Sequence, residues 1–232
     1  MSGETGEPLA VLDGRTLTLA RTAAASALAA SFLARPDARS MAMIGAGALS
    51  PYLIAAHAAV RPIERVAIWN RDGAKAASLA ASLHGGVHDG RRIAVTAASS
   101  IAEAVADADI VSAATMATEP LIRGADLRPG SHVDLVGGFT PAMREADDDA
   151  VRRASVYVDT RVGALAEAGD IVQPIAAGVI GEADIRGDLA DLCRGLSTGR
   201  ADPGEITLFK SVGTALEDLA AASLVYDRVT AG

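Results

Sequence analysis

The 232-residue sequence has few aromatic residues and a single cysteine. Aromatic side chains make up only 3% of it, although half of the residues are apolar, so the core must be built from Ala, Val, Leu and Ile. Such small side chains allow helices to pack closely on a sheet. The lone Cys193 excludes an intramolecular disulfide and fits a reducing compartment. Because no Cys–His signature surrounds it, we expect this thiol to be buried.

Positive charge and long apolar runs are also scarce. The chain has 21 Lys and Arg against 29 Asp and Glu, a net charge of −8. This balance argues against nucleic acid or an anionic membrane as a partner. No apolar run approaches the roughly 20 residues that a bilayer-spanning helix needs. Residues 1–7 lack the basic and apolar parts of a secretion signal, so we expect a cytoplasmic protein.

Metal-binding and hydrolase patterns are missing as well. The four histidines, His57, His84, His88 and His132, show no zinc spacing such as H-E-x-x-H. The longest acidic run, residues 147–149, is interpreted as the first turn of a helix rather than as a metal site. No G-x-S-x-G elbow occurs. We therefore expect no bound metal.

What the chain does contain is a strand, a glycine turn and a helix in direct succession. Residues 41–44 are apolar without alternation, which predicts a short strand buried on both faces of a parallel sheet. The turn Gly45-Ala46-Gly47 follows, and this order places backbone N–H groups and a helix N-terminus where a pyrophosphate could bind. The third position of G-x-G-x-x-G is Ser50, which is small enough for close packing. Such a turn by itself is weak evidence for nucleotide binding.

Further strands alternate with helical patterns along the chain. The predicted strands cover residues 66–69, 93–96, 110–113, 132–136 and 155–158. This alternation predicts an α/β fold with a Rossmann-type, doubly wound, mostly parallel sheet. Outside this core we expect a strand at 7–12, a helix at 19–33, and helical structure from 189 onward that is interrupted by a loop at 195–203 and ends in a long helix at 214–229.

The end of the second predicted strand bears on the choice of cofactor. NAD binding usually requires an acidic side chain at this position, whereas a nearby Arg accommodates the 2′-phosphate of NADP. The chain has Asn70 and Arg71 there, which favours NADP(H) over NAD(H). The alternatives are that Arg71 is a solvated turn residue, or that Asp72 reaches a ribose.

Four stretches together resemble the ornithine cyclodeaminase/μ-crystallin family. They are L-D-G-R-T-L-T-L-A-R-T-A-A-A-S-A-L-A-A (12–30), M-I-G-A-G-A (43–48), V-G-G-F-T-P-A-M-R-E (136–145) and I-T-L-F-K-S-V-G-T-A-L-E-D-L-A-A-A (206–222). The first and last are far more specific than the glycine turn. The resemblance implies a Rossmann domain beside a substrate and dimerisation domain, and a homodimer. Members include ornithine cyclodeaminases, alanine dehydrogenases and reductases of cyclic imino acids or ketimines.

The resemblance also implies roles for individual residues. Arg21 resembles the Arg that binds the substrate carboxylate, and Thr22 the residue beside the cofactor phosphates. The remaining residues expected to bind cofactor are Gly45, Ala46, Gly47, Asn70, Arg71, Thr115, Val136, Gly137, Ser211 and Gly213. Where cyclodeaminases carry an Asp after the Gly-Gly pair this chain has Phe139, which cannot transfer a proton. This favours the reductase branch. The catalytic proton donor stays unknown, with Thr140 as a weak candidate.

A second departure from the family is length. Family members carry a substantial N-terminal segment before the position that matches Met1, and it supplies much of the substrate domain. We therefore expect residues 1–20 and 205–232 to be the remnant of the substrate and dimerisation domain, and residues 21–204 to be the NAD(P)-binding Rossmann domain.

These observations predict an NAD(P)H-dependent reductase of a small cyclic imino acid or ketimine such as Δ1-pyrroline-2-carboxylate, with proline as the product. One alternative is a truncated, non-catalytic NADP(H)-binding protein similar to μ-crystallin. Others are an ornithine cyclodeaminase or alanine dehydrogenase, and an S-adenosylmethionine methyltransferase. The methyltransferase fits poorly, because that class usually requires an acidic residue where this chain has Asn70.

Overall fold

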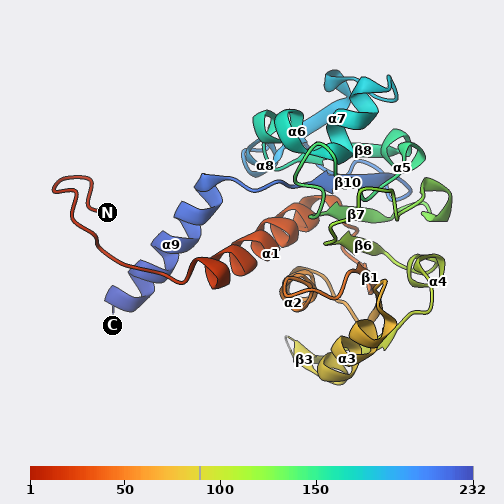
Figure 1. The fold of residues 1–232 in the computed structure, drawn as a ribbon, viewed down its shortest axis with the longest axis horizontal. Helices are drawn as coiled ribbons and strands as arrows, with labels where there is room; N and C mark the ends of the chain where they lie inside the picture. The colour runs from red at the N-terminus through yellow and green to blue at the C-terminus, as the bar shows by residue number, and fades with distance from the viewer. Residues whose placement is uncertain (89, 232) are drawn as a thin grey trace.

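The computed structural model describes residues 1–88 and 90–231 and contains one large parallel sheet (Figure 1). Its eight strands lie in the order β5-β2-β1-β6-β7-β10-β8-β9, and every neighbouring pair is parallel. The strands are β1 Ser40–Ile44, β2 Arg65–Trp69, β5 Ala94–Ala97, β6 Ile110–Ala113, β7 His132–Leu135, β8 Ala154–Val158, β9 Ile185–Asp188 and β10 Ile206–Lys210. A small antiparallel pair, β3 Val87–His88 and β4 Arg91–Arg92, stands apart from it.

Helices cover both faces of this sheet. They are α1 Gly14–Leu33, α2 Ser50–Val60, α3 Gly73–Leu83, α4 Ile101–Val105, α5 Asp148–Arg153, α6 Arg161–Glu167, α7 Gly169–Ala176, α8 Leu189–Cys193 and α9 Ala215–Thr230, with 3-10 turns at Gly124–Asp126 and Glu182–Asp184. Met41 and Met43 of β1 pack in one cluster with α1, α2 and α3, whereas Ala42 and Ile44 pack in a second cluster with α4, α5 and α7. The predicted doubly wound α/β fold is confirmed.

Local sequence signals account for several helix starts. All five residues of β1 are buried, as the uninterrupted apolar pattern predicts. Ser100 caps α4 by accepting from the Glu103 N–H, and Asp147 caps α5 by accepting from the Ala150 N–H. The acidic run therefore opens a helix, as predicted.

The predicted strand at residues 7–12 is wrong. No strand lies there, because nothing beside this segment offers a sheet edge to pair with. The helix expected to begin at residue 19 begins at Gly14 instead. Asp13 is its N-cap and accepts from the Thr16 N–H at 2.8 Å.

The helical prediction from residue 189 onward is also wrong in its middle. β10 is a fully buried strand between β7 and β8, and β9 lies at the sheet edge beside β8. A short apolar run such as I-T-L-F-K cannot be distinguished from a buried helix by periodicity alone. Residues 206–210 therefore belong to the parallel sheet and not to the outlying part that was expected to begin at 205. Cys193 is exposed rather than buried.

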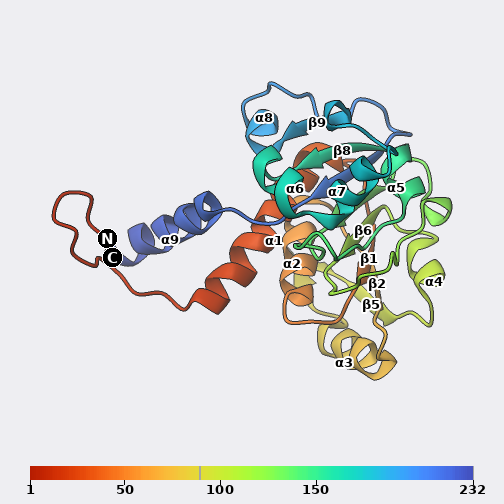
Figure 2. The same ribbon diagram turned by 45° about the horizontal axis from the view of Figure 1, so that its top comes forward.

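The N-terminal half of α1, α9 and residues 1–13 project from the sheet as an arm, and both termini lie at its outer end (Figure 2). α1 is long and apolar enough by length and composition to cross a membrane, which the sequence analysis did not expect. In this structure its buried alanines pack in the same cluster as α2 and the sheet, so we interpret it as a core helix.

Candidate functional site

Two adjacent hollows lie along the carboxyl ends of the central strands, where open α/β sheets bind ligands. The first, the dinucleotide hollow, has a volume of about 370 Å³ and is lined by Gly45, Ala46, Gly47, Trp69, Asn70, Arg71, Asp72, Lys75, Ala114, Thr115, Met116, Ala117 and Leu121. The second, the substrate-side hollow, measures about 440 Å³ and is lined by Thr18, Leu19, Arg21, Thr22, Gly47, Ala48, Leu49, Ala114, Val136, Gly137, Phe139, Ser211, Val212 and Gly213. Gly47 and Ala114 line both hollows. The two hollows therefore form one cleft, and it brings together every predicted binding residue.

The glycine turn closes the inner end of the dinucleotide hollow. Gly45 has a φ of +116°, and a Cβ atom there would lie 2.7 Å from the Ala114 carbonyl oxygen. Only glycine satisfies both conditions without strain. Ser50, the departure from the motif, does more than fit: its hydroxyl accepts from the Gly47 N–H at 3.1 Å and donates to the Gly45 carbonyl at 3.0 Å. This side chain braces the turn from within.

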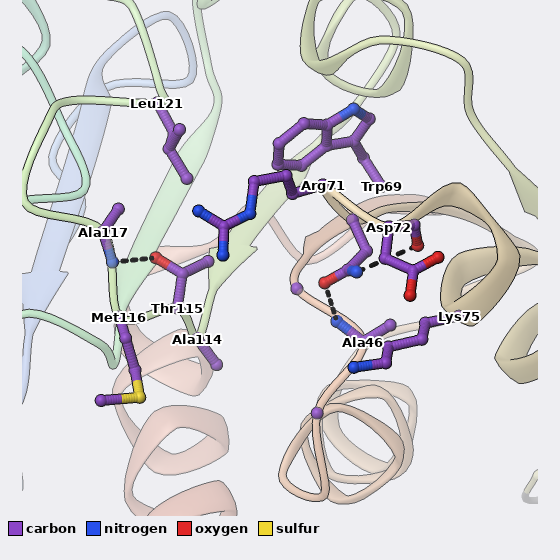
Figure 3. Close-up of a pocket in the computed structure, with 13 residues that line it drawn as sticks. Ala46, Trp69, Arg71, Asp72, Lys75, Ala114, Thr115, Met116, Ala117 and Leu121 are labelled. Atoms are coloured by element: carbon purple, nitrogen blue, oxygen red, sulfur yellow. Dashed lines mark hydrogen bonds between the residues drawn. The ribbon is translucent and has the colours of Figure 1, made fainter.

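The second strand end differs in detail from its prediction. Asn70 accepts from the Ala46 N–H at 3.2 Å and donates to the Asp72 carbonyl at 3.0 Å, so it holds the glycine turn (Figure 3). Asp72 caps α3 by accepting from the Ala74 N–H. Within the described part of the chain no group pairs with the side chain of Arg71 or of Lys75. Figure 3 shows both cationic groups in the dinucleotide hollow.

The substrate-side hollow lies between α1, the β7 turn and the segment after β10. Arg21 reaches across it to the first turn of α9, where Nη1 lies 2.9 Å from Glu217 and Nε 2.9 Å from Asp218. Burial raises the pKa of Glu217, and the Asp159 carboxylate adds to this. Gly213, with a φ of +87°, leaves room for the Arg21 guanidinium, which a Cβ atom would strike. Arg21 therefore joins the arm to the cleft.

Sequence reasoning overlooked the groups that hold the cleft from beneath. Asp159 at the end of β8 accepts from the N–H groups of Val212 and Gly213 at 2.7 and 2.6 Å, and so fixes the segment that lines the substrate-side hollow. Beneath the β7 turn lies a fully buried trio, Glu145, Asp170 and Lys210. Two of the three, Glu145 and Lys210, lie within the matching stretches of the sequence.

The buried trio links the ends of three strands. The Lys210 ammonium donates to the Gly137 carbonyl and lies 3.4 Å from an Asp170 carboxylate oxygen. Glu145 accepts from the Thr115 N–H and hydroxyl at 2.7 and 2.8 Å. Burial raises the pKa of Glu145 to about 7, helped by the Asp170 carboxylate and opposed by the Lys210 charge. Thr140, the weak candidate for a proton donor, lines neither hollow.

The remaining polar groups give no sign of a metal centre. Within residues 1–88 and 90–231 no group of three or more His, Cys, Asp or Glu is placed to hold an ion. His57 contacts Asp134 at 3.1 Å, and His132 contacts the Thr207 hydroxyl at 3.0 Å, both at buried positions. His84 contacts the Val95 carbonyl. The side chain of His88 lies outside the described part, and the absence of a metal stays a prediction.

Comparison with known proteins agrees with this architecture. A model of the ornithine cyclodeaminase/mu-crystallin family matches residues 1–232, the whole chain. The chain belongs to this family. The Δ1-pyrroline-2-carboxylate reductase of Paracoccus denitrificans is 45% identical over 228 residues, which cover 98% of this chain and 70% of that protein.

Solved structures of the family share the fold closely. The Δ1-pyrroline-2-carboxylate reductase of Thermococcus litoralis, in complex with NADH and L-proline, matches with a TM-score of 0.93 at 36% identity, over 98% of this chain and 69% of that one. An archaeal alanine dehydrogenase dimer with bound NAD matches with a TM-score of 0.90 at 29% identity, over 99% and 69%. The family resemblance is confirmed, and these structural neighbours bind NAD(H).

Proposed function

We propose that this protein is an NAD(P)H-dependent reductase of a cyclic imino acid such as Δ1-pyrroline-2-carboxylate, with proline as the product. The observation that carries the proposal is the match between this cleft-bearing fold and the Thermococcus litoralis reductase, solved with NADH and L-proline. The same activity is named for the relative from Paracoccus denitrificans.

The cleft fits a dinucleotide. A Cβ atom at Gly47 would meet nothing within 4 Å, so the turn leaves open space on the cleft side where a phosphate could approach the backbone. When bound, the reduced nicotinamide supplies the hydride that the C=N carbon accepts. The chain supplies orientation and a surface from which water is excluded. Phe139, which lines the substrate-side hollow, offers an apolar ring and no proton, against a cyclodeaminase reaction.

Arg21 is the proposed anchor of the substrate carboxylate. Two carboxylates, those of Glu217 and Asp218, already lie 2.9 Å from its guanidinium at the rim of the substrate-side hollow. A planar guanidinium binds carboxylates in a fixed geometry, which would orient the imine carbon relative to the cofactor.

We further propose that NADP(H) is preferred over NAD(H). Arg71 and Lys75 place two cations in the dinucleotide hollow, which suits a 2′-phosphate. Asp72, the acidic group that could have served a ribose diol instead, is engaged as the cap of α3. A homodimer formed through the arm and a cytoplasmic location belong to the same proposal. Support for the dimer comes from the dimeric archaeal alanine dehydrogenase and from the apolar hollow of about 400 Å³ between α1 and α9.

The test is loss of reduced-nicotinamide absorbance with purified protein, Δ1-pyrroline-2-carboxylate, and NADPH or NADH. We expect saturable turnover, with NADPH the better cofactor. R71A should weaken NADPH binding by roughly 10- to 150-fold and leave NADH binding nearly unchanged, since a charge-assisted phosphate contact is worth about 1.5–3 kcal/mol. Cofactor binding without turnover across a panel of cyclic imino acids would instead support a non-catalytic binder. Equal losses for both cofactors would remove Arg71 from the 2′-phosphate site.

A further inference from the structure

The Gly137–Gly138 peptide lies in the turn that follows β7, above the buried trio. Gly137 lines the substrate-side hollow, and Gly138 has a φ of +59°. Neither residue has a side chain to restrain the peptide between them, so two adjacent glycines make its orientation unusually free. The Gly137 carbonyl oxygen is nevertheless held in place, because it accepts from the Lys210 ammonium at a fully buried site.

The orientation of that carbonyl dictates where the neighbouring donor points. The peptide is trans, so the Gly138 N–H is directed opposite to the Gly137 C=O and thus away from Lys210. Gly138 is buried, and among the residues that the structure describes no group accepts from its N–H. Buried backbone N–H groups are rarely left without a partner. This one lies between Gly137 and Phe139, which both line the substrate-side hollow, so a ligand in that hollow is the acceptor we consider.

Within the trio, Asp170 balances the charge of Lys210. One Asp170 oxygen lies 3.4 Å from the ammonium, while the other accepts from the N–H groups of Glu145 and Ala146 at 2.8 and 2.9 Å. Asp170 also fills the space beside Gly138, since a Cβ atom there would lie 2.5 Å from its carboxylate. Burying two charges costs desolvation free energy that their attraction often fails to repay, so stability alone is a weak reason for such a pair.

We propose that Lys210 is a positioning residue that locks the Gly137–Gly138 peptide, so that the Gly138 N–H is presented as a hydrogen-bond donor to the nicotinamide or substrate in the cleft. Asp170 balances the Lys210 charge. The inference deepens the proposed reductase function and rests on it for the identity of the ligand. Lys210 itself touches no reacting atom. Its effect passes through one peptide bond.

The test compares two neutral double variants that differ in one donor. K210M/D170N removes the ion pair together with the bond to the Gly137 carbonyl, whereas K210Q/D170N removes the ion pair but keeps an N–H donor, one bond shorter than the lysine. The matched control is D109N. Asp109 is a buried carboxylate paired with Arg35 and Arg128 just before β6, at the amino end of the strands and away from the cleft.

Four readouts separate positioning from stability. Quenching of Trp69, the only tryptophan of the chain and a residue of the dinucleotide hollow, measures NADH affinity. Emission of the bound reduced nicotinamide, excited directly, reports the surroundings of the ring. Turnover of Δ1-pyrroline-2-carboxylate gives kcat and KM, and thermal unfolding reports stability.

We expect K210M/D170N to bind NADH within about threefold of the wild type. Its bound emission should shift toward that of free NADH, and its kcat should fall roughly 10- to 100-fold, as for loss of a preorganised donor. K210Q/D170N should recover part of both values. D109N should lose stability and keep kcat. D170N alone retains the Lys210–Gly137 bond, so its folded fraction should keep wild-type emission and kcat within about threefold; it carries the test if K210M/D170N does not fold.

Wild-type emission and kcat in folded K210M/D170N would overturn the proposal and leave Lys210 a structural residue, and so would a tenfold loss of kcat in folded D170N. If the wild type binds NADH but reduces no cyclic imino acid, the proposed function fails, while the emission comparison still decides the positioning role. If the wild type does not bind NADH, both proposals fall.

Discussion

The sheet and the arm differ in how much of their apolar surface is buried. In the sheet, β1, β6, β7 and β10 have every residue buried, and two apolar clusters cover the two faces. In the arm, α9 has no buried residue, and Leu216 and Leu219 are 73% and 62% exposed. Both regions lie within the match to the same family. The comparison shows that a match to a family motif does not by itself tell whether the apolar residues of the matching segment are buried.

The two regions meet at the cleft. Arg21 of α1 holds the first turn of α9 through Glu217 and Asp218, and Asp159 of the sheet holds the segment that leads to it. The substrate-side hollow is therefore bounded on one side by the buried sheet and on the other by the arm, which is packed on one side only. The difference in burial between the sheet and the arm can be tested by mutation and by pH.

The largest effect is expected within the sheet, at the glycine turn. G45A places a Cβ 2.7 Å from the Ala114 carbonyl oxygen at a φ of +116°, so we expect loss of cofactor binding and a free energy of unfolding lowered by at least the cost of the strained φ. Strain of that kind costs about 1–3 kcal/mol. G47A is the matched control, because its Cβ meets no atom within 4 Å.

For G47A we expect an unchanged free energy of unfolding and weaker NADPH binding, since the new methyl group occupies the space open to the pyrophosphate. Urea unfolding and Trp69 quenching measure the two quantities. A G45A variant as stable as G47A would show that the turn is less constrained than the sheet around it.

A smaller effect is expected from pH, again in the sheet. Burial lowers the pKa of His132 to about 3. Between that value and the unfolded pKa near 6.5, the unfolded state binds a proton that the folded state does not, so the free energy of unfolding should fall as the pH drops below about 6.5, by about 1.4 kcal/mol per pH unit. Glu145 acts in the opposite direction, because its raised pKa of about 7 makes stability fall as the pH rises from its unfolded value toward neutrality.

The difference between wild type and H132Q isolates the histidine, since Gln can still bond the Thr207 hydroxyl and does not titrate. Urea unfolding at about pH 5 and about pH 7 measures it. Equal pH dependence in the two proteins would mean that His132 is accessible to protons in the folded state.

The smallest effect is expected in the arm. L219S on α9 should change the free energy of unfolding by no more than about 0.5 kcal/mol if this face stays open to solvent. L208A in the buried β10 should cost about 2–5 kcal/mol. A loss above about 1 kcal/mol for L219S, together with stability that rises with protein concentration, would show that the face is covered by a second copy, as in the proposed homodimer.

Much of the fold could be predicted from the sequence, because its signals are local. A strand buried on both faces of a sheet has an unbroken apolar run, as in β1. Capping residues such as Ser100 and Asp147 indicate helix starts from the local sequence alone. Gly45 is required by backbone geometry at its own position. Of the residues that line the two hollows, the family resemblance identified those in the matching stretches, such as Arg21, Gly45 and Gly213. Asn70, Arg71 and Thr115 lie outside these stretches, at the ends of predicted strands.

The tertiary structure decided what local patterns leave open. β10 is a strand because β7 and β8 offer it two edges to pair with, whereas residues 7–12 meet no edge and form none. The Asn70 side chain bonds to the glycine turn, and Arg71 lines the dinucleotide hollow. Glu145, Asp170 and Lys210 come from the loop before α5, from α7 and from the end of β10, and only the folded chain brings these three segments together. A sequence determines what each segment is able to do, but burial and charge pairing depend on neighbours that only the folded chain supplies.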